Sequence, residues 1–158
     1  MILLKNEDQI NGIRKSCHLL ADLFNEIIPR VKPGISTKEI DDWCCEFVRK
    51  FGGVPAWYEE NFPGCACISI NNQVIHGVPS RKRIVKDGDL VSLDIGINLN
   101  GFISDSTHTV LVGNVKPVHQ KLCRVTGESL MAGIAACQKG NRVSDIANAV
   151  YKICAEEN

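Results

Sequence analysis

The feature that most constrains the fold is the alternating stretch from residue 90 to residue 113. Apolar and polar residues take turns there with a period of two, which is typical of strands with one buried face. The segment "LVSLDIGI" (90–97) predicts one strand and "FISDSTHTVLVG" (102–113) predicts the next, with "NLNG" (98–101) as the turn between them. We therefore expect a long antiparallel hairpin.

Two aspartates, Asp94 and Asp105, lie in this hairpin, and its register decides how they meet. If the turn is centred on residues 99–100, the two aspartates face each other directly, and paired Cβ atoms in a sheet lie about 4.5 to 5.5 Å apart. If residues 100–101 form the turn instead, Asp94 faces Thr107 and Asp105 becomes a diagonal neighbour. In both registers the two carboxylates share one face of the sheet.

Two like charges on one face of an apolar hairpin need compensation. A shared proton would supply it, and a divalent cation would supply more, because hard cations prefer carboxylate oxygens. The alternative is a solvated sheet face on which Asp105 bonds to Ser106 or to nearby backbone. In "NNQVIHGVP" (71–79) we expect a turn at 71–73 and then His76 near the end of a strand, next to a loop; a single histidine there is either structural or catalytic.

Helical periodicity frames the strands on both sides. The segment "STKE" (36–39) is a capping box that opens one helix, "ACISI" (66–70) predicts a further strand, and Ser144 is placed to cap the last helix. A helix is also expected from Pro117 to about Gln138. The expected inward faces are Ile10, Ile13, Cys17, Leu20, Phe24 and Ile27 in residues 7–28, then Ile40, Cys44, Phe47 and Val48, then Ile146, Val150, Ile153 and Cys154.

A weak internal repeat relates two segments, "PGISTKEIDDWCCEFV" and "KGNRVSDIANAVYKIC". Gly34 precedes Ile40 by six residues, and Gly140 precedes Ile146 by six, with similar apolar spacing afterwards. Any two amphipathic helices share such a pattern. The other interpretation is two related halves, of which the second lacks its strands.

Composition limits the classes of function. The chain of 158 residues has 18 basic and 18 acidic residues, so nucleic acid is not an expected partner. The N-terminal apolar stretch, Ile2 to Leu4, is too short for a signal peptide, and no run is long enough for a membrane span, which predicts a cytoplasmic protein. The 8 cysteines contain no C-x-x-C spacing, so we expect most of them to be reduced core residues, with neither a disulfide framework nor a structural zinc site.

Four motifs in this order resemble the type I methionine aminopeptidases of peptidase family M24. They are "VKPGISTKEID" (31–41), "CISINNQVIHGVP" (67–79), "DGDLVSLDIG" (87–96) and "GFISDSTHTVLVG" (101–113), and the resemblance runs over the whole chain. It implies an α+β pita-bread (creatinase/aminopeptidase) fold. The expectation is the first half plus the opening helices of the second, as a single, incomplete catalytic domain over residues 1–158.

The resemblance also implies an activity, the metal-dependent removal of the initiator methionine from nascent polypeptides. Family members hold two divalent ions (Co, Mn, Fe, Zn or Ni, which the sequence does not distinguish) on two Asp, one His and two Glu. By that match Asp94 holds one metal and Asp105 bridges both, His76 is catalytic and contacts substrate, and the methionine pocket is lined by Phe62 and Cys67. A metal-bridging hydroxide would attack the scissile carbonyl.

The chain departs from the family pattern in two places. Nothing matches the remaining His and two Glu ligands, because Glu128, Glu156 and Glu157 fall on predicted helices. Family members also carry an aromatic residue or His with Gly ahead of the Phe-Pro pair, where this chain has Glu60 and Asn61.

Three functions follow for the chain. It is the N-terminal portion of an aminopeptidase that acts on nascent N-termini, ribosome-associated in the cell; or a non-catalytic pita-bread-derived module that binds a protein or peptide; or a homodimer of halves that rebuilds a sheet. An unfinished sheet would leave an open edge, which also predicts self-association.

Overall fold

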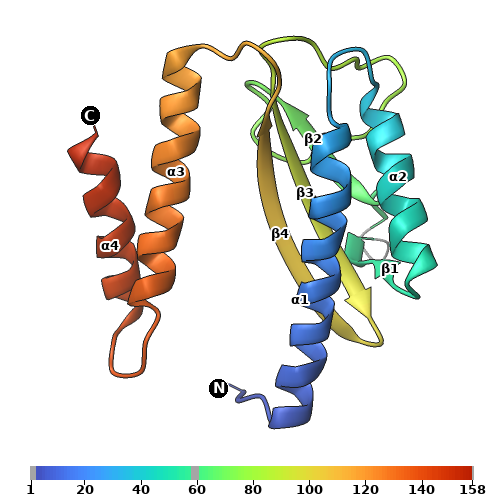
Figure 1. Cartoon of the computed structure of the whole chain (residues 1–158). Coiled ribbons are helices and arrows are strands. Elements are labelled where there is room, and N and C mark those ends of the chain that lie inside the picture. The colour runs from blue at the N-terminus through green and yellow to red at the C-terminus, as the bar shows by residue number, and fades with distance from the viewer. Residues whose placement is uncertain (1–2, 58–60, 158) are drawn as a thin grey trace. The chain divides into compact units, whose positions relative to one another are not determined.

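The computed structural model describes residues 3–57 and 61–157. Its elements in chain order are α1 (Glu7–Ile27), the 3-10 helix η1 (Ile28–Arg30), α2 (Thr37–Lys50), β1 (Val54–Pro55), β2 (Ala66–Ile70), β3 (Leu90–Leu99), β4 (Phe102–Leu111), α3 (Pro117–Ala136) and α4 (Val143–Glu156) (Figure 1). The chain divides into two compact units, Met1–Asn114 and Val115–Asn158. That the whole chain forms one domain stays a prediction.

The first unit is built around β3. Strand β4 pairs antiparallel with the full length of β3, while β2 and β1 pair antiparallel with successive parts of it, at Val91–Ile95 and Ile97–Asn98. Because β4 occupies one edge of β3 completely, β1 and β2 share the other edge. The strands that the sequence predicted in 66–70, 90–97 and 102–113 are present. The strand expected to end near His76 is wrong, because residues 74–79 form no strand.

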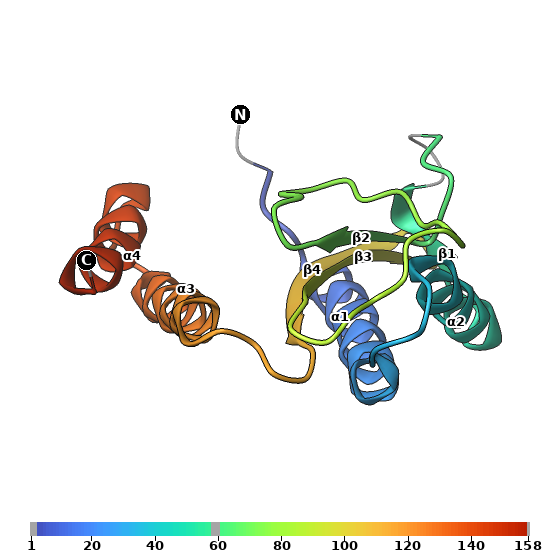
Figure 2. The ribbon, with the colours of Figure 1, turned by 90° about the horizontal axis from the view of Figure 1, so that it is seen from above.

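The two faces of the sheet differ sharply in composition. Helices α1 and α2 lie against one face (Figure 2). Toward these helices β3 points four side chains that are fully buried, and each contributes roughly 1.5 to 3 kcal/mol by leaving water; they are Val91, Leu93, Ile95 and Ile97. The alternate residues of β3 point to the opposite face, because side chains alternate along a strand; they are Ser92, Asp94, Gly96 and Asn98.

Helix α1 contributes the apolar face of residues 20–27 to this core, but its predicted stripe is wrong nearer the N-terminus. Ile10 is 43% exposed and Cys17 is also exposed, while Ser16 is buried. The Ser16 hydroxyl lies 2.9 Å from the Ser104 hydroxyl and donates to the carbonyl oxygen of Ile97 at 3.2 Å. A buried hydroxyl pair therefore joins α1 to the hairpin where the pattern predicted apolar contact.

Helix α2 begins as the sequence predicts. Ser36 is the N-cap, its hydroxyl accepts a hydrogen bond from the Glu39 N–H, and the Glu39 carboxylate accepts from the Ser36 N–H at 2.8 Å. This capping box satisfies backbone donors that the first turn leaves unpaired. The predicted inward face is confirmed, since all four of its residues are buried.

The second unit consists of α3 and α4, which pack side by side and are joined by residues 137–142. Gly133 of α3 allows close packing, because a Cβ there would lie 3.0 Å from Val150 Cγ2 of α4. The predicted cap at Ser144 is wrong: Arg142 is the N-cap, so Ser144 lies inside the first turn. Cys154, expected inward, is exposed.

One pair of cysteines contradicts the expectation that the chain lacks a disulfide, whereas the expectation that most cysteines are reduced holds for the six outside this pair. Cys45 in α2 and Cys65 just before β2 form a disulfide across 20 residues of sequence. The sequence contains no spacing signal for this pair, because only the packing of α2 beside the start of β2 brings the two residues together.

None of the helices among the described residues is long and apolar enough to cross a membrane.

Candidate functional site

The turn of the hairpin fixes how the two aspartates meet. Asn100 and Gly101 form the two-residue turn with φ of 55° and 85°. Hairpin turns of this kind need positive φ at both positions, which Asn-Gly adopts readily and Leu does not. The register centred on residues 99–100 is therefore wrong, and the alternative is correct: Asp94 pairs with Thr107, and Asp105 pairs with Gly96.

Asp94 and Asp105 are consequently diagonal neighbours on the face that α1 and α2 leave open. The Thr107 hydroxyl donates to Asp94 Oδ1 at 2.8 Å, which fixes one oxygen of that carboxylate. Partial burial and then the negative charge of Asp94 raise the pKa of the Asp105 carboxyl, while a backbone hydrogen bond at Ser106 lowers it by less. The two carboxylates thus repel each other, which is the condition that a cation would relieve.

A cavity of about 340 Å³ lies beside Asp94 and gathers most of the other predicted site residues. Its lining consists of Trp57, Asn61, Phe62, Pro63, Cys67, His76, Val78 and Asp94. Cys67 pairs directly with Asp94 across β2 and β3, so both side chains point to the same face. Asp105 is on that face but not in the cavity lining. The roles of these five residues stay predictions.

The position of His76 depends on the glycine that follows it. A Cβ on Gly77 would lie 2.0 Å from the carbonyl oxygen of Ile68, so only glycine can approach β2 this closely. The Gly77 carbonyl accepts from the Ile68 N–H at 2.8 Å, and its own N–H donates to the Ser69 hydroxyl. His76 itself has φ of 59°, a conformation that non-glycine residues rarely adopt and that often marks functional sites.

Sequence reasoning missed the aromatic wall of the cavity. Gly96 lies on the aspartate face, where a Cβ would stand 2.9 Å from Ala56 and 3.2 Å from the Trp57 ring. A glycine inside a strand is a signal of close approach by another segment, and it could have pointed to Trp57. Of the two residues that depart from the family pattern, Glu60 lies outside the described residues and Asn61 lines the cavity.

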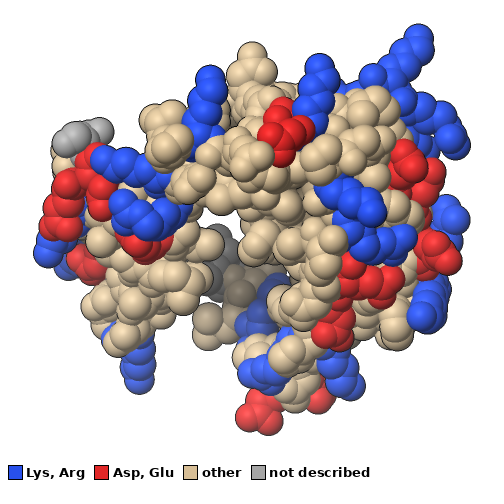
Figure 3. Space-filling model, turned by 45° about the horizontal axis from the view of Figure 1, so that its top comes forward, with Lys and Arg blue, Asp and Glu red and all other residues tan. Residues whose placement is uncertain are grey.

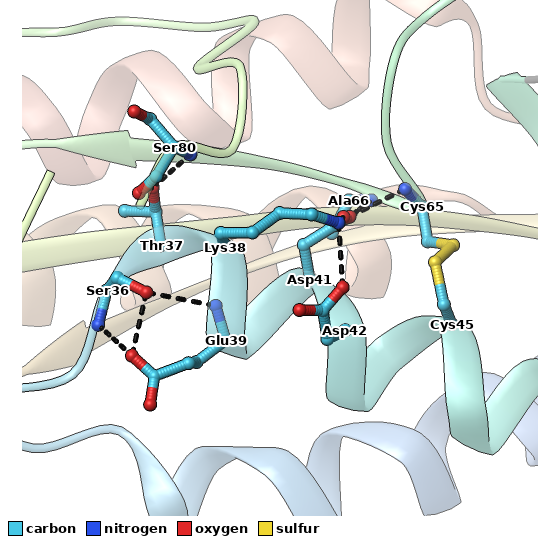
Figure 4. Close-up of polar contacts among 10 residues, drawn as sticks. All are labelled: Ser36, Thr37, Lys38, Glu39, Asp41, Asp42, Cys45, Cys65, Ala66 and Ser80. Atoms are coloured by element: carbon cyan, nitrogen blue, oxygen red, sulfur yellow. Dashed lines mark hydrogen bonds and ion pairs between the residues drawn. A yellow bond between two sulfur atoms is a disulfide. The ribbon is translucent and has the colours of Figure 1, made fainter. Parts of the chain in front are cut away.

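A buried carboxylate anchors the segment that leads into this cavity (Figure 4). Asp41 of α2 is fully buried, and its Oδ1 accepts from the N–H groups of Cys65 at 2.6 Å and Ala66 at 3.1 Å. Lys38 Nζ lies 2.8 Å from Asp41 Oδ2 and compensates its charge. These contacts hold the start of β2, and with it Cys67, in place.

Two groups of side chains in the described part of the chain have donor atoms that suit a metal. Asp94 and Asp105 offer carboxylate oxygens on one open face, and their mutual repulsion fits a hard divalent cation. The ligand atoms of Asp41, Cys45 and Cys65 also lie within 4.8 Å of one another. In that second group, however, the disulfide occupies both sulfur atoms, and the ammonium of Lys38 already compensates the carboxylate.

Comparison with known proteins identifies the family. The model of metallopeptidase family M24 matches residues 11–158. The chain belongs to this family. It is 57% identical to the methionine aminopeptidase of Treponema pallidum (strain Nichols) over 98% of the chain and 60% of that relative. The methionine aminopeptidase of Clostridium perfringens (strain 13 / Type A) is 44% identical over 96% of the chain and 61% of the relative.

Solved structures confirm the fold class of this M24 chain. The methionine aminopeptidase from Rickettsia prowazekii matches all of the chain and 64% of its own length, with a TM-score of 0.95 at 31% identity. An Xaa-Pro dipeptidase from Bacillus anthracis matches with a TM-score of 0.86 at 22% identity, a likeness of fold alone. The α+β pita-bread expectation is confirmed, and the chain spans about 60% of the length of the curated relatives that it matches. Members of a metallopeptidase family use divalent metal.

Proposed function

We propose that this M24 chain is part of a methionine aminopeptidase, which removes the N-terminal initiator methionine from nascent polypeptides. The observation that carries the proposal is the cavity that brings Phe62, Cys67 and His76 next to Asp94. The loop before β2, strand β2, the segment after it and strand β3 each contribute to this cavity, on the face that Asp94 shares with Asp105. The named methionine aminopeptidases among its relatives support the same activity.

We assign Asp94 and Asp105 as the residues that would hold two divalent metal ions, Asp94 as a ligand of one ion and Asp105 as a ligand of both. Bound there, the ions would supply an activated water and polarise the scissile carbonyl. The chain's own contribution is to keep Asp94 Oδ1 fixed through the Thr107 hydroxyl, which orients the carboxylate. Carboxylate ligands alone do not select among Co, Mn, Fe, Zn and Ni.

The remaining cavity residues fit the recognition of a methionine side chain. Phe62 supplies an aromatic surface, with which a thioether makes favourable contact, and Cys67 supplies a small buried one. His76 lines the same cavity and is exposed, so its imidazole is available to hydrogen-bond the substrate near the peptide bond to be cleaved. This assigns His76 as catalytic and Phe62 and Cys67 as substrate-binding.

The cellular setting follows from this activity. Nascent polypeptide N-termini are the proposed substrates, encountered in the cytoplasm and at the ribosome. On the face shown in Figure 3, Lys and Arg are interspersed with Asp and Glu, in keeping with the balanced formal charge. Among the described residues β4 pairs only with β3, and we propose its other edge as a route to self-association.

Metal binding by the chain tests the assignment most directly. Titration calorimetry with Mn²⁺ should show binding that Asp94→Ala weakens at least about tenfold, since one of few carboxylate ligands is lost. Asp22→Ala, an exposed aspartate on α1, is the matched control and should bind as the unchanged chain does. Equal binding by the Asp94→Ala variant would contradict the assignment. Methionine release from Met-Ala-Ser, with the same pair of variants, then tests the activity.

The alternative function is a non-catalytic module that binds a protein or peptide. The small number of metal ligands assigned here supports this alternative. Beside the two aspartates no glutamate ligand is assigned, because Glu128 lies in α3 and Glu156 in α4 rather than on strands. Binding of Met-Ala-Ser that persists in EDTA and is unchanged by Asp94→Ala would support the module. Binding that needs metal and Asp94 would support the aminopeptidase.

A further inference from the structure

We infer that Cys45 and Cys65 are a reversible thiol–disulfide site that controls how firmly the Phe62 wall of the cavity is held against α2. The cross-link joins the half-buried Cys45 of α2 to the residue that immediately precedes β2 (Figure 4). The loop that it closes, residues 46–64, contains both Trp57 and Phe62 of the cavity lining. The inference goes beyond the proposed function, and only its consequence for methionine binding rests on that function.

The disulfide is reachable from solvent on one side only. A groove of about 540 Å³ runs along α2 and is lined by Lys38, Asp41, Asp42, Cys45, Glu46, Arg49, Phe62, Pro63 and Gly64. Cys45 is half-buried in this groove, whereas Cys65 is 1% exposed. We therefore expect a small dithiol to attack the sulfur of Cys45 rather than that of Cys65.

Phe62 and Pro63 line both this groove and the cavity beside Asp94. They form a thin partition between the disulfide and the candidate active site. Gly64 is packed tightly behind them, since a Cβ there would lie 3.0 Å from Asp41 Oδ1 and 3.2 Å from the Phe62 ring. A change in how residues 61–64 are held is thus transmitted directly to the cavity wall.

Hydrogen bonds to Asp41 favour re-formation of the cross-link after reduction. They hold the N–H groups of Cys65 and Ala66 and do not involve either sulfur atom, so we expect them to persist when the S–S bond is broken. After reduction, the Cys65 thiol therefore stays beside α2, within reach of Cys45. The neighbouring Cys44 does not interfere, because burial and the charge of Asp41 raise the pKa of its thiol to about 12, and the protonated thiol is a poor nucleophile.

The chemistry balances with a dithiol as reductant. One reductant thiolate attacks Cys45 Sγ, the S–S bond breaks, and its electron pair leaves on Cys65 Sγ, which takes up a proton. The second thiolate of the reductant then attacks the reductant sulfur of this mixed disulfide. Cys45 leaves as a thiolate and takes up a proton, and the reductant becomes an intramolecular disulfide. Oxidised glutathione reverses the reaction, with two molecules of reduced glutathione as the product.

A metal site formed by the same residues is the competing interpretation. The ligand atoms of Asp41, Cys45 and Cys65 are close enough to surround one ion. Against it, Asp41 already accepts hydrogen bonds from two backbone N–H groups and the Lys38 ammonium. A cation would have to displace or adjoin that ammonium, which opposes its binding.

Hydrogen exchange on the full chain tests the inference without any need for catalysis. The Phe62 N–H donates to the Trp57 carbonyl at 3.3 Å, so its exchange reports opening of the loop. Reduction with dithiothreitol should accelerate exchange in residues 61–64 about tenfold, because a loop restraint is removed. Oxidised glutathione should restore slow exchange. Exchange that is the same in both states would overturn the inference.

Variants and thiol labelling complete the test. The double variant Cys45→Ser with Cys65→Ser should exchange rapidly in residues 61–64 with or without reductant, while Cys17→Ser, at an exposed cysteine, should respond as the unchanged chain does. Iodoacetamide should label Cys45 and Cys65 only after reduction, and Cys45 faster. Labelling of both in the oxidised chain, or protection of both by one equivalent of Zn²⁺ after reduction, would overturn the inference.

Discussion

The two helix pairs of this chain share a local pattern but differ in what they pack against. Helices α1 and α2 have 21 and 14 residues, and α3 and α4 have 20 and 14. Gly34 and Gly140, which stand at matching places before the second helix of each pair, have φ of 97° and 99°. These similarities agree with the internal repeat seen in the sequence.

Burial separates the two pairs. Ile40 of α2 is fully buried, and the inward residues that follow it are buried as well. The corresponding Ile146 of α4 is only half-buried, and no residue of α4 is buried among those described. The comparison shows that a shared sequence pattern determines where the helices begin, how long they are and which face is apolar. The burial of that apolar face against the sheet determines how much it stabilises the fold.

The largest expected difference lies in matched core substitutions. Ile40→Ala should lower the free energy of unfolding by roughly 3 to 4 kcal/mol, because it leaves a cavity between α2 and the sheet. Ile146→Ala should cost roughly 1 kcal/mol, since its side chain is already partly hydrated. Urea unfolding followed by circular dichroism measures both. Equal costs would show that the two helices are buried to the same extent in solution.

The two glycines should instead behave alike. Gly34→Ala and Gly140→Ala each place a side chain in the left-handed region, which costs roughly 1 to 2 kcal/mol. Neither site has an atom within 4 Å of the added Cβ, so packing adds nothing to either cost. Thermal unfolding of the two variants should therefore give similar losses. A large difference would mean that the repeat does not extend to the backbone.

The caps of the second helices should differ again. Ser36→Ala removes the hydroxyl that accepts from the Glu39 N–H and should cost about 1 kcal/mol. Ser144→Ala should change stability by less than about 0.5 kcal/mol, because Ser144 lies inside α4 and is not its cap. The same unfolding assay compares them. If Ser144→Ala were the more costly change, the start of α4 would be misplaced.

The smallest effect concerns the pH dependence of the first cap. Hydrogen bonds from the Ser36 N–H and hydroxyl lower the pKa of the Glu39 carboxyl from 4.5. A carboxyl whose pKa is lowered by folding stabilises the folded chain at pH values above its pKa in the unfolded chain. This stabilisation is lost as the pH falls through its pKa in the folded chain. Glu39→Gln should therefore lower the melting temperature slightly at pH 7 and have less effect at about pH 3. If the loss of melting temperature in Glu39→Gln grew larger toward acid pH, the lowered pKa of Glu39 would be contradicted.

Some features of the candidate site could be predicted from the sequence, and others could not. The shared face of Asp94 and Asp105 was predictable, because alternation along the strands places both on one side in either register. The choice between the registers needed only the Asn-Gly turn. The convergence of Phe62, Cys67 and His76 was expected only through the family resemblance, and Trp57 was missed because its proximity comes from packing against Gly96.

The sequence by itself determined the local features of this protein: the helix capped at Ser36, the strands of the hairpin, and the alternation that separates an apolar face from the aspartates. These depend on backbone preferences and on neighbours a few residues away. Only the tertiary structure decided that Ser16 is buried in place of Cys17 and that Cys45 meets Cys65. Such contacts join residues 20 to 88 positions apart, whose meeting depends on how whole elements pack, and no local pattern encodes it.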